Sequence, residues 1–181
     1  DRKYTNYIND SSICNYKNTI SNYAYTHYIS GGHVLVTREN ISKNEIGRYS
    51  ALYCYSNQNT AFITFTSFVN NTSTDFGCLY FGCPQEIHKC NILYNEQSTT
   101  NLPSIIYASY SLFIYSSCIL ENNKGKRVFH SNSGSDRIAL FDCTLDENIF
   151  SNSRYYGNVT IYETNTKAFI NGLQHINTNL C

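Results

Sequence analysis

The chain has 181 residues, no net formal charge, and only 14% charged residues against 41% hydrophobic and 15% aromatic residues. This length fits one domain, and the neutral balance gives no basic surface for binding nucleic acid. No apolar run approaches the roughly 18 residues that a membrane-spanning helix needs, so we expect no transmembrane segment. Because methionine is absent, we expect the sequence to be a piece of a longer protein.

Residues 1–33 match only loosely a repeat that fills residues 34–181. Aligning Cys14 with Glu39 leaves polar residues, Asn9 and Ser11, at positions that are apolar in the later copies. Repeat proteins need ends that are more polar than their middle, so we expect a capping rung over residues 1–33. The Gly31-Gly32 pair predicts a turn that leads into the first full copy.

The repeat is clearest in the stretch from Phe113 to Asn123. Relative to Cys118, apolar residues stand five before (Phe113), three before (Tyr115) and two after (Leu120), and an asparagine stands five after (Asn123). The reference positions of successive copies are residues 39, 66, 90, 118, 143 and 171, which are 27, 24, 28, 25 and 28 residues apart. A period of this size is typical of a solenoid.

The spacing inside each copy favours strands over helices, because inward and outward side chains alternate at every second residue. The change of phase between the second apolar position and the reference position predicts a bend between two short strands. Such copies stack in parallel, one strand spacing apart, as a parallel β-helix. We expect the core to include Phe68, Ile92, Leu120 and Leu145.

An asparagine ends the second strand of most copies. Asparagine tolerates the left-handed backbone conformation of a turn, and stacked amides can hydrogen-bond from copy to copy. We therefore expect a ladder at Asn44, Asn71, Asn95, Asn123 and Asn148.

A third short strand follows each asparagine after a linker of variable length. Its inward column would hold Leu52, Leu79, Ile106 and Phe129. The residues between the inward positions would then form a vertical stack on the outside, a strip roughly 14 Å long. Rings with a polar tip can contact sugars or anchor a protein. The predicted ligand-binding residues are Tyr53, Tyr80, Tyr107 and His130.

These in-register copies resemble the right-handed parallel β-helix proteins of the pectate-lyase-like fold, which include polysaccharide lyases, surface adhesins and polymorphic outer-membrane-type repeats. The resemblance covers about residues 34–176 and implies an all-β fold of about six or seven rungs. It implies little about activity, because the fold hosts enzymes and inert scaffolds alike.

A carbohydrate-active enzyme, a lyase or a hydrolase, would need acidic residues projecting from one column. Glu121 and Asp146 each stand three after the reference position in adjacent copies and would project about 5 Å apart, which suits paired carboxylates. The short Asp-Asp and Gly-His-Gly signatures that the resemblance would imply for an enzyme are absent. Two solvated carboxylates near basic residues explain the pair equally simply.

The eight cysteines show no metal-binding spacing, and we expect no metal or other cofactor. Cys90, Cys118 and Cys143 share one inward column and would point the same way, which favours buried thiols over disulfides. Five N-x-S/T sequons, at Asn9, Asn40, Asn70, Asn71 and Asn158, are compatible with secretion.

Together these features favour a non-enzymatic surface or secreted module, an adhesin-like scaffold that binds glycans or proteins. The alternatives are the carbohydrate-active enzyme and an intracellular structural scaffold or filament-associated protein, which reduced thiols would favour.

Overall fold

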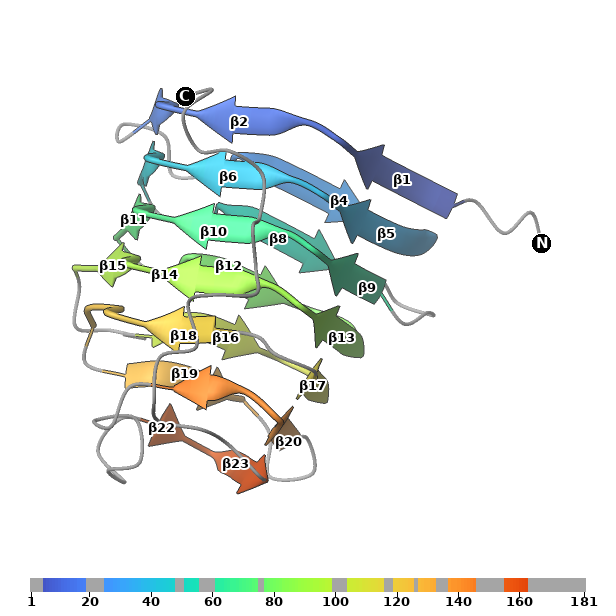
Figure 1. The fold of residues 1–181 in the computed structure, drawn as a ribbon, viewed down its shortest axis with the longest axis vertical. Coiled ribbons are helices and arrows are strands. Elements are labelled where there is room, and N and C mark those ends of the chain that lie inside the picture. The colour runs from blue at the N-terminus through green and yellow to red at the C-terminus, as the bar shows by residue number, and fades with distance from the viewer. Residues whose placement is uncertain are drawn as a thin grey trace.

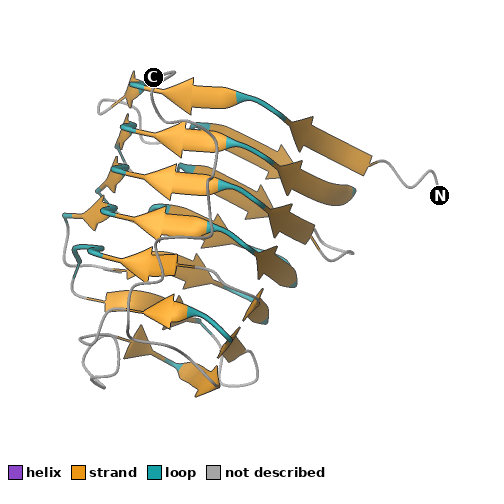
Figure 2. Cartoon of the chain, viewed as in Figure 1, coloured by secondary structure: helices purple, strands orange, loops and turns teal. Residues whose placement is uncertain are grey.

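In a computed structural model of the chain, the residues described are 5–18, 25–47, 51–55, 61–74, 77–98, 104–115, 119–125, 127–132, 137–145 and 155–162. This part of the chain consists of strands joined by bends and turns and contains no helix (Figure 2). All strand pairs are parallel, and each strand pairs with the equivalent strand one turn away. The strands stack as successive turns of a solenoid (Figure 1), so the predicted all-β parallel β-helix is confirmed.

Four sheets run along the solenoid, and we name them A to D in the order in which the chain meets them. Sheet A contains β1 (Thr5–Asn9), β5 (His33–Thr37), β9 (Ala61–Thr64), β13 (Gln85–His88), β17 (Leu112–Tyr115), β20 (Arg137–Phe141) and β23 (Asn158–Tyr162). Sheet B contains β2 (Ser12–Cys14), β6 (Asn40–Ser42), β10 (Ser67–Val69), β14 (Asn91–Leu93), β18 (Ile119–Glu121) and β21 (Thr144–Leu145).

The other two sheets close each turn. Sheet C contains β3 (Lys17–Asn18), β7 (Glu45–Ile46), β11 (Thr72–Ser73) and β15 (Glu96–Gln97). Sheet D contains β4 (His27–Ser30), β8 (Leu52–Tyr55), β12 (Leu79–Phe81), β16 (Ser104–Ala108), β19 (Arg127–Ser131) and β22 (Tyr155–Tyr156). The sequence pattern predicts linkers at the places where the strands of sheet C lie, because strands of two residues are too short to show the alternation of inward and outward side chains.

The described residues form about four turns with all four sides present, fewer than the six or seven rungs expected, because sheet C has only 4 strands while sheet A has 7. Beyond β15, the described part of sheet C continues only as a single bridge between Glu96 and Lys124.

The core fills the inside of the solenoid with one layer of side chains per turn. Phe68 and Ile92 are fully buried, as predicted, and so is Leu145. Leu120 pairs in register with both Ile92 and Leu145, but its side chain lies outside the described part. The inward column of sheet D is confirmed as well, since its members are fully buried: Leu52, Leu79, Ile106 and Phe129.

One copy of the repeat was placed one residue out of register. Leu112 and Ile114 are the buried residues of β17, whereas Phe113 and Tyr115, predicted to point inward, lie half-buried on the outer face. Ile114 pairs in register with Ile87, and Leu120 pairs in register with Ile92. However, Leu120 follows Ile114 by six positions, whereas Ile92 follows Ile87 by five. The extra residue falls in the segment 116–118, outside the described residues, which includes Cys118.

The first turn also needs a different alignment. Ile13 pairs with Ile41 and Cys14 pairs with Ser42, so Ser11, not Cys14, is the residue that corresponds to Glu39. With this offset β1 pairs along its whole length with β5, and residues 5–18 form a regular turn that is more exposed than the later ones. The predicted turn at Gly31-Gly32 is confirmed, since both glycines have a positive φ.

The asparagine ladder is confirmed for Asn44, Asn71, Asn95 and Asn123, which are buried, while Asn148 lies outside the described residues. The Nδ2 groups of Asn44, Asn71 and Asn95 each donate to the Oδ1 atom of the next asparagine along the axis, at 2.9, 3.0 and 3.1 Å. The predicted reason was partly wrong. The left-handed residue is the one before each asparagine, as at Lys43 and Asn70, and the asparagine itself supplies the bonds that hold this bend.

Candidate functional site

The four residues predicted to bind a ligand are brought together as one column of stacked rings on the outer face of sheet D. The ring centroids of Tyr53 and Tyr80 are 4.4 Å apart with 5° between the ring planes, and those of Tyr80 and Tyr107 are 5.1 Å and 7° apart. His130 continues the column, with its ring 4.7 Å from that of Tyr107. In-register parallel pairing of β8, β12, β16 and β19 produces this alignment.

The column is longer than predicted by one ring at each end. Tyr28 stacks on Tyr53 at 5.2 Å, and Tyr156 packs on His130 at 4.7 Å. Both could have been found from the sequence, because Tyr28 stands 25 residues before Tyr53 and Tyr156 stands 26 residues after His130. We call this set the sheet D ring ladder: Tyr28, Tyr53, Tyr80, Tyr107, His130 and Tyr156.

Exposure differs sharply along the ladder. Tyr28 and Tyr156, at the two ends, are 56% and 52% exposed, whereas Tyr107 is 5% and His130 is 4% exposed. Because each inner ring has a neighbouring ring against both faces, a sugar cannot stack on it. Tyr53 and Tyr80 are half-buried.

Three members of the ladder have pKa shifts that favour their uncharged forms. Burial, and the neighbouring Tyr80, raise the pKa of the Tyr53 hydroxyl, and burial raises the pKa of Tyr107. Burial lowers the pKa of His130, and the charge of Arg127 lowers it further. The Tyr80 hydroxyl lies 3.1 Å from the Ser109 hydroxyl, so a polar rim accompanies the rings.

A second column of stacked rings, which the sequence did not predict, lies on the outer face of sheet A. The ring of Tyr115 lies 4.9 Å from His88 on one side and 4.9 Å from Phe141 on the other, and Phe141 lies 4.7 Å from Tyr162. The sequence-based prediction missed this column because it placed β17 one residue out of register and so assigned Tyr115 to the interior. His88 Nε2 also lies 3.1 Å from the Glu86 carboxylate.

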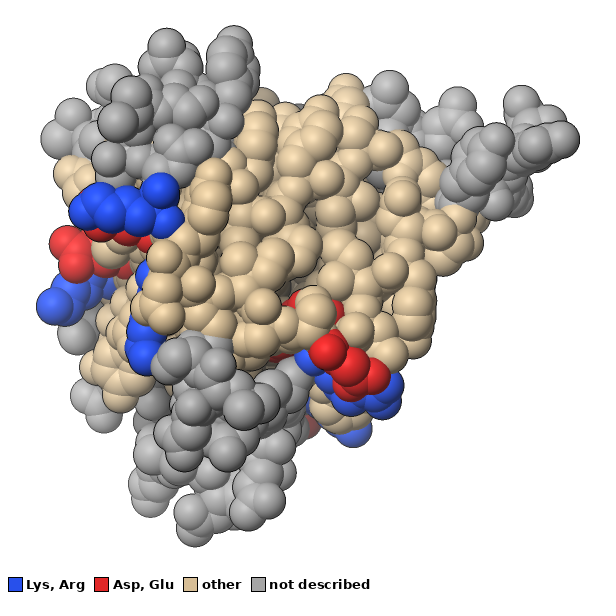
Figure 3. Space-filling view, turned by 90° about the horizontal axis from the view of Figure 1, so that it is seen from above, with Lys and Arg blue, Asp and Glu red and all other residues tan. Residues whose placement is uncertain are grey.

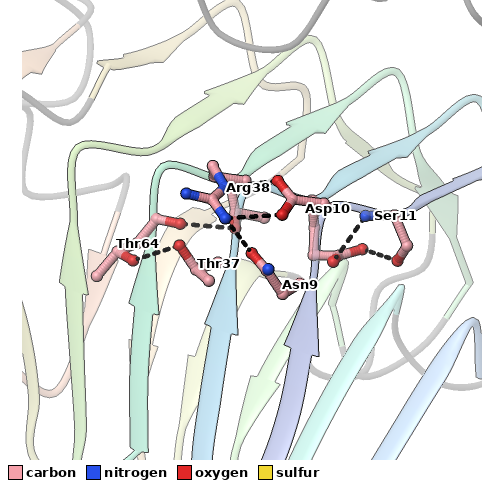
Figure 4. A network of polar contacts seen from close by, with 8 residues as sticks. Asn9, Asp10, Ser11, Thr37, Arg38 and Thr64 are labelled. Atoms are coloured by element: carbon pink, nitrogen blue, oxygen red, sulfur yellow. Dashed lines mark hydrogen bonds and ion pairs between the residues drawn. The ribbon is translucent and has the colours of Figure 1, made fainter.

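Charged side chains gather at the corner between sheets A and B at the start of the solenoid. The Arg38 guanidinium donates to the Asp10 carboxylate at 2.5 and 2.7 Å and to Asn9 Oδ1 at 3.0 Å (Figure 4). The hydrogen bond from Arg38, with its positive charge, lowers the pKa of Asp10. Both side chains are more than half exposed, so this pair contributes little stability.

One carboxylate is buried inside the solenoid. Glu39 is 0% exposed and accepts hydrogen bonds from the main-chain N–H of Ser11 at 3.1 Å and from the Ser11 hydroxyl. Burial lowers the pKa of His27, and the charge of Glu39 opposes this effect only in part. Viewed along the axis from this end, charged atoms lie at the margins of the visible face (Figure 3).

The weaker candidates, Glu121 and Asp146, are not brought together by any described contact. Glu121 lies at the end of β18 with its side chain outside the described part, and Asp146 lies outside the described residues. In the described ranges, no group of three or more His, Cys, Asp or Glu residues is placed to hold a metal ion. Nor does the described part of the chain contain a helix that could cross a membrane.

The fold and these columns define a parallel β-solenoid with aromatic ladders on two outer faces. Comparison of the chain with protein-family models, curated proteins and solved structures finds no match.

Proposed function

We propose that this chain is a non-enzymatic module of a surface or secreted protein, an adhesin-like scaffold that binds glycan or protein partners through the sheet D ring ladder. The observation that carries the proposal is the ladder itself, six ring-bearing residues repeated once per turn in a continuous column. Pectate-lyase-like adhesins and outer-membrane-type repeats remain the families whose repeat this chain resembles.

The exposure of the rings decides how a partner would bind. Tyr53 and Tyr80 are partly exposed along the column, and Tyr28 and Tyr156 at its ends are more than half exposed. A neutral glycan, with many hydroxyl groups and few charges, suits such a rim, because the hydroxyls of tyrosine both donate and accept hydrogen bonds. The low charged fraction of 14% supports a neutral partner as well.

Cysteine chemistry supports a secreted location without deciding it. Cys14 is disulfide-bonded, and disulfides persist in oxidising compartments. Cys90 and Cys143 are buried thiols, as predicted, but their burial protects them from oxidants in any compartment. An intracellular scaffold remains the alternative if the disulfide of Cys14 is absent from the protein isolated from its source.

The test is a glycan-array and cell-binding comparison of variants that keep the ladder. Tyr53→Phe/Tyr80→Phe preserves both rings and removes only their hydroxyl groups, so we expect the fold to persist and binding to fall at least about tenfold, as the loss of one or two hydrogen bonds requires. Tyr115→Phe in the sheet A column is the matched control and should bind normally. Unchanged binding in both the phenylalanine variant and Tyr80→Ala would exclude this surface.

Polysaccharide cleavage is measured in parallel, because the resemblance also includes enzymes. Cleavage by the wild type that disappears in Glu121→Gln/Asp146→Asn would replace the binding module with a carbohydrate-active enzyme. No cleavage by the wild type would leave the scaffold as the better description.

A further inference from the structure

Two cysteines of adjacent turns face each other inside the solenoid. Cys54 is an inward residue of β8, and Cys83 lies just after β12, in the turn before β13. Their Sγ atoms are 3.8 Å apart, and both side chains are fully buried. Cys54 is in register with Phe81, so Cys83 stands two residues beyond the register partner of Cys54.

This arrangement differs from that of the other thiols in the described part of the chain. The Sγ atoms of Cys90 and Cys143 lie 3.3 Å from main-chain carbonyls of their own turns, and that of Cys78 lies 3.4 Å from the carbonyl of Asn71. In-register cysteines of a parallel sheet point the same way and cannot easily be bridged. This restriction does not apply to Cys83, because it lies in a turn. Its side chain therefore approaches Cys54 from a different direction than a strand residue in register would.

We propose that Cys54 and Cys83 form a disulfide that ties two adjacent turns together when the chain folds under oxidising conditions. The sulfur atoms must approach from 3.8 Å to about 2.05 Å, a shift that rotation of the two side chains can provide. Each thiol loses its hydrogen, the two sulfurs bond, and an oxidant of the disulfide class, such as oxidised glutathione, is reduced to two thiols.

The bond forms during folding rather than afterwards. The hydrogen bond with Cys83, together with burial, raises the pKa of the Cys54 thiol, so the nucleophilic thiolate is scarce in the folded protein. Full burial also keeps a second disulfide from reaching either sulfur. Once formed, the bond is equally protected from reductants, so it behaves as a permanent link and does not switch.

The sequence allows a direct test by mass spectrometry. Residues 49–89 contain no internal Lys or Arg and form one tryptic peptide, which holds Cys54, Cys78 and Cys83. The full chain is refolded from denaturant with reduced and oxidised glutathione, or with reductant alone, then denatured, alkylated and digested. In the oxidised sample we expect the peptide to take up one alkyl group instead of three. Without that group, its mass should be about 2 Da below the mass of the peptide with three free thiols.

Two variants identify the bonded pair. In Cys78→Ser the peptide contains only Cys54 and Cys83, and we expect it to lose two hydrogens and take no alkyl group after oxidative refolding. In Cys83→Ser both remaining cysteines should be alkylated. Full alkylation of the Cys78→Ser peptide after oxidative refolding overturns the proposal, and so does a two-hydrogen loss that persists in Cys83→Ser.

A stability comparison excludes a bond formed only in misfolded chains. The comparison uses the variant Cys14→Ser/Cys78→Ser, which lacks the disulfide of Cys14. This protein should need more urea to unfold after oxidative refolding than after refolding in reductant, because the link restricts the unfolded chain. An unchanged or lower urea midpoint would mean that the bond does not form in the native solenoid. Binding of any ligand plays no part in these measurements, so they stand apart from the test of the ring ladder.

Discussion

Replacing Asn71 by alanine tests whether the asparagine ladder holds the turns together. The Asn71 side chain is fully buried. Its Oδ1 atom accepts from the main-chain N–H of Asn44 at 3.2 Å and from Asn44 Nδ2 at 2.9 Å. Its Nδ2 group donates to the carbonyl of Ile41 at 2.8 Å and to Asn95 Oδ1 at 3.0 Å. Alanine removes all four bonds.

The magnitude follows from what each lost bond leaves behind. The main-chain N–H of Asn44 loses the acceptor that Asn71 provides in a dry interior, at a cost of about 1 to 3 kcal/mol, and the other three bonds contribute about 0.5 to 1.5 kcal/mol each. We therefore expect Asn71→Ala to lower the free energy of unfolding by about 2.5 to 7.5 kcal/mol.

The matched control is the neighbouring residue. Asn70 has an exposed side chain and a φ of 54°, so Asn70→Gly keeps the bend without strain and should change the stability by less than about 1 kcal/mol. Urea unfolding followed by tyrosine fluorescence measures both variants, since the chain has 17 tyrosines and no tryptophan. A loss of stability in Asn71→Ala that is no larger than in Asn70→Gly would refute the reasoning. The hydrogen bonds of the buried amide would then contribute no more stability than hydrogen bonds to water.

Three further predictions concern the core, the ring ladder and the sequons. Phe68→Ala should destabilise by about 3 to 5 kcal/mol in urea unfolding because its side chain is fully buried, and an equal loss in the outward variant Phe62→Ala would contradict this. Burial lowers the pKa of His130 in the folded protein, so as the pH falls the imidazole is protonated in the unfolded chain before it is protonated in the folded protein. Stability should therefore fall as the pH drops below about 6.5, by up to about 1.4 kcal/mol per pH unit. His130→Tyr should flatten the measured curve of stability against pH, and parallel curves for the variant and the wild type would contradict this prediction. In a host that attaches N-glycans, peptide mapping of the folded protein should find glycans only at exposed sequons such as Asn70 and Asn158, whereas glycans on the buried Asn40 or Asn71 would mean that the register is wrong.

The sequence predicts the solenoid well because one physical requirement, an apolar interior, repeats in every turn. Four described copies, with reference positions 39, 66, 90 and 143, keep the same distance between their inward residues, and these residues are buried. The prediction failed where the chain inserts one residue between Ile114 and Leu120. Aromatic residues are as apolar as aliphatic ones by simple classification, so Phe113 and Tyr115 satisfied the pattern that Leu112 and Ile114 occupy in the fold.

The bends show the same limit. The positive-φ residue before sheet B is Arg38, Phe65 or Lys89 in successive turns, and none of these is a residue that favours the left-handed region. Their conformation is imposed by the hydrogen bonds of the turn below and above, such as the bond from the N–H of Phe65 to the carbonyl of His88. Asp10 and Asp142 occupy the equivalent position in two other turns, and aspartate does favour this region, so the residue type marks this bend in only some of the turns.

The ring ladder illustrates why a repeated column is a weaker guide to binding than to structure. The spacing of Tyr53, Tyr80 and Tyr107 correctly placed their rings in one stack, but stacking closes the faces that a sugar would use. The same contact that makes the column visible in the sequence therefore gives much of it a structural role. If the proposed binding is correct, we expect recognition to depend on what breaks the repetition: the exposed end residues Tyr28 and Tyr156, and the polar rim that Tyr80 shares with Ser109. This is why removal of the hydroxyl groups, which leaves the stack intact, separates binding from support more cleanly than removal of the rings.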